Sequence, residues 1–287
     1  MAEKHIDEIS GVETTGHEWD GIRELNNPMP RWWLWAYYGT IVWGIIYMIL
    51  YPAWPLVNEA TKGVLGYSSR AELAADMEGA RVAQGGIMEK ISKVSLEEIL
   101  ADPQLAQFAT AGGASAFRVN CVQCHGTGAT GGQGYPNLND DDWLWGGDIN
   151  AIYQTIAHGI RDNLDPDTHF SEMPAYMDVL EPVEVRQIAA YVVSLSGTPR
   201  DASMVEPGQQ LYLDNCAACH GEDAQGDREF GAPNLADAIW LKVEGEAEIA
   251  AQIQAPKHGM MPAWGGRLSS ETVKQLAVYV HSLGGGE

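Results

Sequence analysis

The longest apolar run in the chain covers residues 32–51, WWLWAYYGTIVWGIIYMILY, which holds 20 residues without a charged side chain. At about 1.5 Å per residue, a helix of this length spans roughly 30 Å, the thickness of the hydrocarbon layer of a membrane. Tryptophan and tyrosine gather at both ends, as they do at membrane interfaces. Pro52 and Pro55 then end the helix. The pattern predicts a transmembrane anchor over residues 31–57. A buried core helix or an uncleaved signal peptide would show the same pattern, and these are the alternative interpretations. No small-residue cleavage site follows the apolar run.

The remaining pattern divides the chain into four further parts. Residues 1–30 are polar and acidic and predict a tail, and residues 58–107 show weak helical periodicity that predicts a linker with short helices. Residues 108–198 and 199–287 carry two copies of one helical module. The copies share Pro-Asn-Leu followed by Trp-Leu, and both end in an amphipathic helix, residues 185–191 and 273–279, at a fixed offset of 88 positions. The sequence therefore predicts a mainly α protein with an internal repeat.

Each copy contains one Cys-x-x-Cys-His motif, Cys121-Val122-Gln123-Cys124-His125 and Cys216-Ala217-Ala218-Cys219-His220. This is the attachment signature of haem c, in which the two thiols bond the porphyrin and the histidine becomes an axial iron ligand. A zinc site, a thioredoxin-like redox pair and a structural disulfide are the alternatives. The two motifs lie 95 residues apart, and histidine follows both times, which none of these alternatives requires. We expect two covalently attached haem c groups on Cys121, Cys124, Cys216 and Cys219, with His125 and His220 as iron ligands.

The repeat also selects candidates for the second axial ligand. Met173-Pro174-Ala175 and Met261-Pro262-Ala263 align at the offset of 88, and only these two methionines occur in both copies. A methionine sulfur is a soft ligand that raises the potential of a haem above that of a bis-histidine haem. We expect Met173 and Met261 to bind iron, although methionines also fill gaps in hydrophobic cores. Bis-histidine ligation is the competing interpretation, and its candidates are His158, His169 and His258.

Several other features have both a functional and a structural interpretation. The segment between His158 and Met173 is 12 residues longer than its counterpart and contains Arg161, Asp162, Asp165, Asp167 and His169. It could select a partner at a haem edge, or be a solvated loop. The run Asp140-Asp141-Asp142 is more typical of a solvated turn than of a metal site. Trp143 and Trp240 are expected to pack in the cores, against each porphyrin.

Composition limits the partners. The formal net charge is −22, from 39 acidic and 17 basic residues, which repels nucleic acid and favours encounter with a basic protein. All four cysteines belong to the two motifs, so none remains for a disulfide framework. Lys4, Arg23 and Arg31 before the anchor slightly outweigh Lys62 and Arg70 after it, which favours a cytoplasmic N-terminus. Because haem c is attached on the outer side of a bacterial inner membrane, we expect a single-pass protein with periplasmic haem domains.

The N-terminal segment narrows the comparison to one family. It reads Gly16-His17-Glu18-Trp19-Asp20-Gly21-Ile22, then Glu24-Leu25-Asn26-Asn27-Pro28 and Pro30-Arg31-Trp32-Trp33-Leu34-Trp35, and it leads into Tyr51-Pro52-Ala53-Trp54-Pro55. With the two haem modules, this arrangement resembles the dihaem subunit (subunit III) of cbb3-type cytochrome c oxidase. The modules alone resemble the broader class I cytochrome c superfamily. Some members of the subunit family have two membrane helices, whereas this sequence shows one.

The resemblance implies a fold, a set of partners and a role. The fold would be one N-terminal transmembrane helix followed by two class I cytochrome c domains in tandem. The chain would accept electrons from a cytochrome c or the bc1 complex and pass them toward the haem–copper catalytic subunit by way of the monohaem subunit. It would serve a terminal oxidase of the respiratory chain without reducing oxygen itself. The implied ligand groups are Cys121, Cys124, His125 and Met173 for one haem, and Cys216, Cys219, His220 and Met261 for the other.

Other function classes remain open at this point. A dihaem cytochrome subunit of a periplasmic dehydrogenase would share both haem modules, but the N-terminal segment disfavours it. A dihaem peroxidase needs one iron with an open position, and a methionine available to each haem argues against that. A haem-based sensor would need a signalling module, which the sequence does not show.

Overall fold

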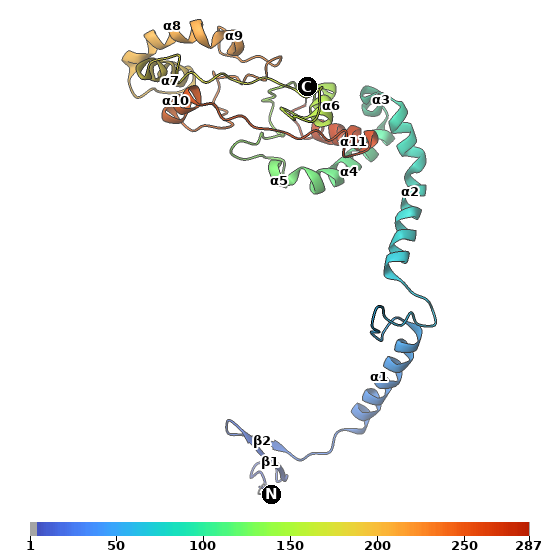
Figure 1. Cartoon of the computed structure of the whole chain (residues 1–287). Coiled ribbons are helices and arrows are strands. Elements are labelled where there is room, and N and C mark those ends of the chain that lie inside the picture. The colour runs from blue at the N-terminus through green and yellow to red at the C-terminus, as the bar shows by residue number, and fades with distance from the viewer. Residues whose placement is uncertain (1–4, 287) are drawn as a thin grey trace. The chain divides into compact units, whose positions relative to one another are not determined.

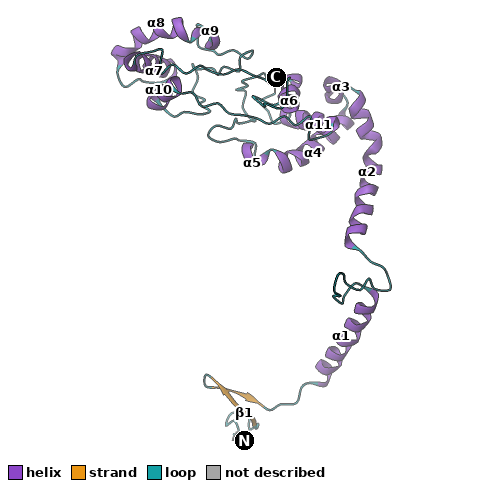
Figure 2. Ribbon diagram, viewed as in Figure 1, coloured by secondary structure: helices purple, strands orange, loops and turns teal. Residues whose placement is uncertain are grey.

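The computed structural model describes residues 5–286, and these are mainly helical, as the sequence predicts (Figures 1 and 2). The chain divides into two compact units, Met1–Ala83 and Gln84–Glu287. Parts of two expectations lie outside the described residues. They are positions 1–4 of the N-terminal tail, with the Lys4 charge used for orientation, and the last position of the second haem domain.

The predicted N-terminal tail contains a β-hairpin. Strands β1 (Thr14–Trp19) and β2 (Ile22–Leu25) pair antiparallel, with Trp19 opposite Ile22. Asp20 and Gly21 connect them, and both have positive φ, 48° and 84°. An Asp-Gly pair with two positive φ angles is the usual two-residue hairpin turn, because its twist matches that of the strands. The sequence analysis treated this segment only as polar and so missed the turn signal.

Helix α1 (Arg31–Leu50) is the predicted membrane helix. It is 20 residues long, has a mean hydropathy of 1.4, and buries no side chain against the rest of the described chain. Pro30 precedes its first residue, and Tyr51 closes its last turn by donating to the carbonyl of Tyr47 at 2.8 Å. Length and apolar surface together make α1 suited to crossing a membrane.

The linker differs from the predicted series of short helices. Helix α2 (Ser69–Lys93) runs for 25 residues, and only α3 (Leu96–Ala101) is short. The prediction of short helices depended on the weak helical periodicity of residues 58–107, and α2 continues through the glycines at 79, 85 and 86 although glycine lowers helix propensity. Good helix formers dominate between them, and a Glu89–Lys93 ion pair at 2.6 Å adds local support. A capping box between Ser95 and Glu98 then starts α3.

The second unit contains the two haem motifs and the helices around them. Asp102 caps α4, whose first residue is Pro103, so this helix begins inside the predicted linker range of 58–107. The elements of this unit after α3 are α4 (Pro103–Asn120), α5 (Val122–His125), α6 (Ile149–His158), α7 (Pro182–Ser196), the short 3₁₀ helix η1 (Ala202–Met204), α8 (Val205–Asn215), α9 (Ala217–His220), α10 (Glu246–Gln254) and α11 (Ser270–His281).

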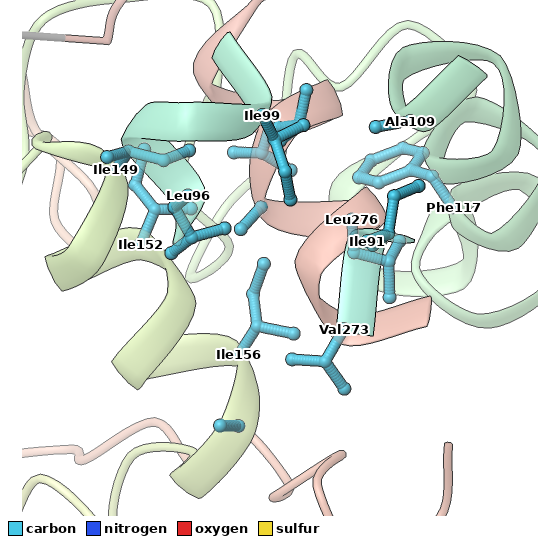
Figure 3. Packing of buried hydrophobic residues seen from close by; sticks show 14 of the residues in the cluster. Ile91, Leu96, Ile99, Ala109, Phe117, Ile149, Ile152, Ile156, Val273 and Leu276 are labelled. Carbon is cyan, nitrogen blue, oxygen red and sulfur yellow. The ribbon is translucent and has the colours of Figure 1, made fainter. Parts of the chain in front are cut away.

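Buried side chains of this unit form two hydrophobic cores, and each core is built from both halves of the repeat. In the first core, side chains of α4 and α6 meet those of α11, the last helix of the second copy, and Figure 3 shows Phe117, Ile156, Val273 and Leu276 among them. In the second core, α8 and α10 meet α7, the last helix of the first copy. The two modules follow each other in sequence, but in space they have exchanged their C-terminal helices.

Equivalent contacts mark the exchange in both cores. Phe117 of α4 packs against Tyr279 of α11, with ring centroids 5.4 Å apart. Tyr212 of α8 packs against Tyr191 of α7 at 5.2 Å. Gly113 lies so close to α11 that a Cβ there would collide with a backbone carbonyl, and Gly208 stands in the same relation to α7.

The longer loop of the first copy takes part in the crossing. Ile160, just after α6, forms a two-way backbone pair with Met261, with N–O distances of 2.9 and 3.0 Å. In the second core, the backbone amide of Tyr176 donates to the carbonyl of Ile253 at 3.1 Å. Exchanging identical elements preserves the contacts of a closed module, which is why such swaps occur at low cost. Each core therefore contains residues of both predicted ranges, 108–198 and 199–287.

Candidate haem site

The two haem motifs have nearly the same backbone structure. Each follows directly on a long helix, α4 or α8, and forms a one-turn helix, α5 or α9. In the first, the amide of His125 donates to the carbonyl of Cys121 at 2.9 Å, and in the second His220 donates to Cys216 at 3.0 Å. This turn brings both thiols and the histidine of a motif close together on one short segment of the chain. The geometry is what a motif needs to hold one prosthetic group by three side chains.

Hydrogen bonds orient both histidine rings. The Nδ1 atom of His125 lies 3.1 Å from the carbonyl oxygen of Pro136, and Nδ1 of His220 lies 3.1 Å from that of Pro233. Since a carbonyl can only accept, Nδ1 carries the proton and Nε2 keeps a free lone pair. Burial lowers the pKa of both rings, and the hydrogen bond to the carbonyl opposes this in part. A neutral imidazole with its second nitrogen fixed is the form that binds metal.

The thiols differ in exposure within each motif. Cys121 and Cys216 are half-buried, and Cys124 and Cys219 are exposed. Burial raises the pKa of Cys121 and of Cys216 to about 11. Such thiols stay protonated at neutral pH in the absence of a bound group.

Both motifs open into one continuous cavity of about 740 Å³. Its wall includes all four cysteines, both motif histidines, and the candidate ligands Met173 and Met261. The cavity size lies in the range usual for cofactor sites. These residues fit haem c, because each motif presents two thiols and a free imidazole nitrogen to the same space as a thioether sulfur.

The packing of the two cores places each candidate methionine beside the haem motif of the other half of the chain. Met261 packs against the first core together with Cys121, whereas Met173 packs against the second core together with Cys216. Each methionine therefore lies with the motif of the other half of the chain, because each precedes one of the exchanged helices. The resemblance implies Met173 with His125 and Met261 with His220, and that grouping stays a prediction; the packing of the two cores favours the opposite grouping.

The competing histidines have other surroundings. His158 Nδ1 lies 3.2 Å from the carboxylate of Asp165, and with Asp167 these groups form a small cluster on the longer loop. His169 stacks on Trp145 at 4.4 Å and does not line the cavity. Only His258 of the three lies in the cavity wall, and it is exposed. Trp143 packs against the first core and Trp240 against the second, which confirms their expected place in the cores, whereas their contact with a porphyrin stays a prediction.

The structure adds residues that the sequence analysis did not single out for this site. The buried carboxylate of Asp162 accepts from the amide of Ala263 at 2.7 Å and from that of Leu164 at 2.9 Å. These two bonds hold the pKa of Asp162 below its usual value. The bond to Ala263 fixes the loop that carries Met261 to the longer loop of the first copy. Pairing between loops 101 residues apart leaves no periodic signal, so sequence reasoning had no means to find it.

Comparison with known proteins places the chain in a family. Residues 11–58 match the N-terminal domain of cytochrome oxidase cbb3, FixP, and residues 108–192 and 203–280 match cytochrome c oxidase, cbb3-type, subunit III. A cbb3-type cytochrome c oxidase subunit FixP of Rhizobium meliloti is 64% identical over 284 residues, covering 99% of this chain and 98% of the relative. The chain belongs to the subunit III family of cbb3-type cytochrome c oxidase.

More distant members of the subunit III family align over nearly the same length. Subunit CcoP of Cereibacter sphaeroides is 51% identical over 96% of this chain and 95% of its own length, and FixP of Bradyrhizobium diazoefficiens is 48% identical over 98% of both. The chain is thus a subunit of a cytochrome c oxidase complex, which implies a catalytic subunit as partner. Its two cytochrome c modules imply haem c. The family assignment favours this interpretation over a subunit of a dehydrogenase.

Proposed function

We propose that the chain is the membrane-anchored dihaem electron carrier of its oxidase. It takes single electrons from a cytochrome c or the bc1 complex and delivers them, by way of a monohaem subunit, to the haem–copper subunit that reduces oxygen. The observation that carries the proposal is the cavity shared by both haem motifs and both methionines. Two redox centres in one cavity can exchange electrons within the subunit.

The residues divide the work of holding two haem c groups. Cys121 and Cys124 attach one haem, and Cys216 and Cys219 attach the other, by thioether bonds. We assign His125 and Met261 as the axial pair of the first site. His220 and Met173 form the pair of the second, in accord with the packing of each core. Haem c supplies a one-electron ferric–ferrous couple when bound. With a histidine and a methionine held to each iron in this way, both haems would serve electron transfer and would leave no place for peroxide or oxygen to bind.

The anchor and the surface charge fit this role. Helix α1 keeps the carrier beside the membrane-bound catalytic subunit, and we place the N-terminus in the cytoplasm and the haem unit in the periplasm of the bacterial inner membrane. The net charge of −22 favours a basic electron donor, at rates that fall as salt increases.

Purification and redox titration test the proposal together. The complex is extracted in mild detergent, its partners are identified by mass spectrometry, and covalent haem is counted per polypeptide. We expect haem–copper and monohaem subunits, two covalent haems, and two low-spin centres in the resting protein. A dehydrogenase partner, fewer than two covalent haems, or a high-spin resting iron would overturn it.

A further inference from the structure

The cavity wall carries positive charge in a protein that is otherwise strongly acidic. Among the residues that line it, Arg161, Lys242 and Arg267 are cationic, and Glu172 is the one carboxylate. The whole chain has 39 acidic and 17 basic residues, so this local balance is the opposite of the global one. A positively charged wall in an acidic protein points to an anionic group inside the cavity.

Arg161 is fixed in place by neutral partners. Its Nε donates to the carbonyl of Gly259 at 2.6 Å, and a terminal nitrogen donates to that of Ser171 at 2.8 Å. Its backbone φ is 53°, a left-handed conformation that a long side chain adopts rarely. Carbonyls orient the guanidinium without neutralising it. Glu172 attracts it, but the described residues place no carboxylate within ion-pair distance.

Lys242 lines the same cavity and, like Arg161, is held by a backbone carbonyl. Its ammonium donates to the carbonyl of Lys257 at 2.8 Å and has no ion-pair partner among residues 5–286. Burial is the main cause that lowers its pKa, and repulsion by Arg161 is the second. Two half-buried cations that repel each other are unfavourable unless an anion lies between or beside them.

Both cations stand outside the repeated pattern. Arg161 belongs to the longer loop, which the second copy lacks, and Lys242 aligns with Trp145 of the first copy. The repeated helical module therefore does not require either cation. Their presence in one shared cavity indicates a task specific to the two-haem arrangement.

We propose that Arg161 and Lys242 together bind carboxylate groups of the haem propionates and thereby raise the reduction potential of the haem beside them. The proposal rests on the function proposed above. A guanidinium forms paired hydrogen bonds with a carboxylate, and an ammonium adds a point charge. Negative propionates beside an iron stabilise the ferric state, which carries one positive charge more than the ferrous state; cations that neutralise them therefore favour the ferrous state, and low dielectric in the cavity strengthens the effect.

Redox titration of the full-length, haem-loaded complex tests this, with Arg161→Gln, Lys242→Gln and the double variant. The control is Lys257→Gln, which removes one charge from an exposed lysine close by that does not line the cavity. Covalent haem content and the absorption band of methionine-ligated ferric haem are recorded for each protein.

We expect each single variant to lower the midpoint potential of at least one haem, and the double variant to lower it further, with haem content and the methionine band retained. Lys257→Gln leaves both midpoints unchanged, and Lys242→Arg, which keeps the charge, stays near the wild type. The proposal is wrong if the Lys242→Gln titration superimposes on the wild type, which decides the matter even where Arg161→Gln fails to accumulate. An equal decrease in Lys257→Gln or in Lys242→Arg contradicts it as well.

A free anion could occupy the same cations. Titrations in chloride and in phosphate at equal ionic strength separate the two sources, because a covalently attached haem keeps its propionates in both. Midpoints that depend on phosphate in the wild type but not in the double variant would overturn the assignment to propionates. Absence of covalent haem from the wild type would instead refute the function proposed above, so the two failures are distinguishable.

Discussion

The exchanged helices predict which aromatic pairs are energetically coupled. Phe117 contacts Tyr279 from the far end of the chain, at a ring distance of 5.4 Å, and Phe117 is 1% exposed. Tyr191, the equivalent tyrosine of its own module, packs in the other core against Tyr212. A double-mutant cycle with Phe117→Leu and Tyr279→Leu isolates the pair, since each change removes one ring and keeps an apolar side chain.

The expected coupling follows from the geometry. A tilted aromatic pair at this distance contributes about 0.5–1.5 kcal/mol beyond the area it buries. We therefore expect a coupling of about 1 kcal/mol, whereas distant residues are additive within about 0.3–0.5 kcal/mol. Phe117→Leu combined with Tyr191→Leu is the matched control, and its coupling should be zero within error.

Unfolding by guanidinium of the haem-loaded, full-length protein in detergent measures both cycles. Absorption of methionine-ligated haem reports the loss of the haem cores. If modules closed on themselves, the coupling would appear for Phe117 with Tyr191 and vanish for Phe117 with Tyr279. That result would refute the exchange and, with it, the ligand assignment built on it.

Three further predictions follow from individual contacts. Asp162→Asn removes the charge of the carboxylate that accepts from the amide of Ala263, so methionine ligation of one haem should weaken at neutral pH. In the wild type, this hydrogen bond to the carboxylate is complete above about pH 5 and is lost as the pH falls through the lowered pKa of Asp162. Equal acid titrations of the methionine absorption band in both proteins would contradict this. Gly113→Ala should destabilise the haem unit by about 1–3 kcal/mol in guanidinium unfolding, whereas Gly79→Ala, in an open part of α2, should stabilise its helix or change nothing; equal effects would contradict the close crossing of α4 and α11. Lys274 donates to three backbone carbonyls at the end of α2. Lys274→Met should therefore speed amide hydrogen exchange in residues 84–95 while both haems stay bound. Unchanged exchange would contradict this and show that other contacts hold the linker.

Local chemistry is what the sequence could predict. The membrane helix and the two Cys-x-x-Cys-His motifs are each recognised from residues close together in the chain, whereas the binding of iron by the methionines stays a prediction. The hairpin was missed although Asp20-Gly21 is a known turn signal, because the segment was judged by its polarity. The length of α2 could not be predicted from periodicity, because the helical pattern of residues 58–107 is weak.

Long-range pairing is what the sequence could not predict. Both copies end in the same kind of helix, so the pattern that packs α11 on α8 would equally pack it on α4. The observed arrangement includes contacts of the longer loop after α6, such as Ile160 with Met261 and Asp162 with Ala263. Such contacts join segments about a hundred residues apart and have no periodicity to reveal them. The cationic wall was hidden for the same reason, because Arg161 and Lys242 meet only in the fold.

The central claim is that each iron is bound by a histidine from one half of the chain and a methionine from the other. An experimental density map of the purified, haem-loaded oxidase complex tests it most directly, because the haem attached to Cys121 and Cys124 can be identified by its two thioether bonds. The account predicts the sulfur of Met261 opposite His125 on that iron, and the sulfur of Met173 opposite His220 on the other. Density that joins Met173 to the iron of the first motif would contradict it.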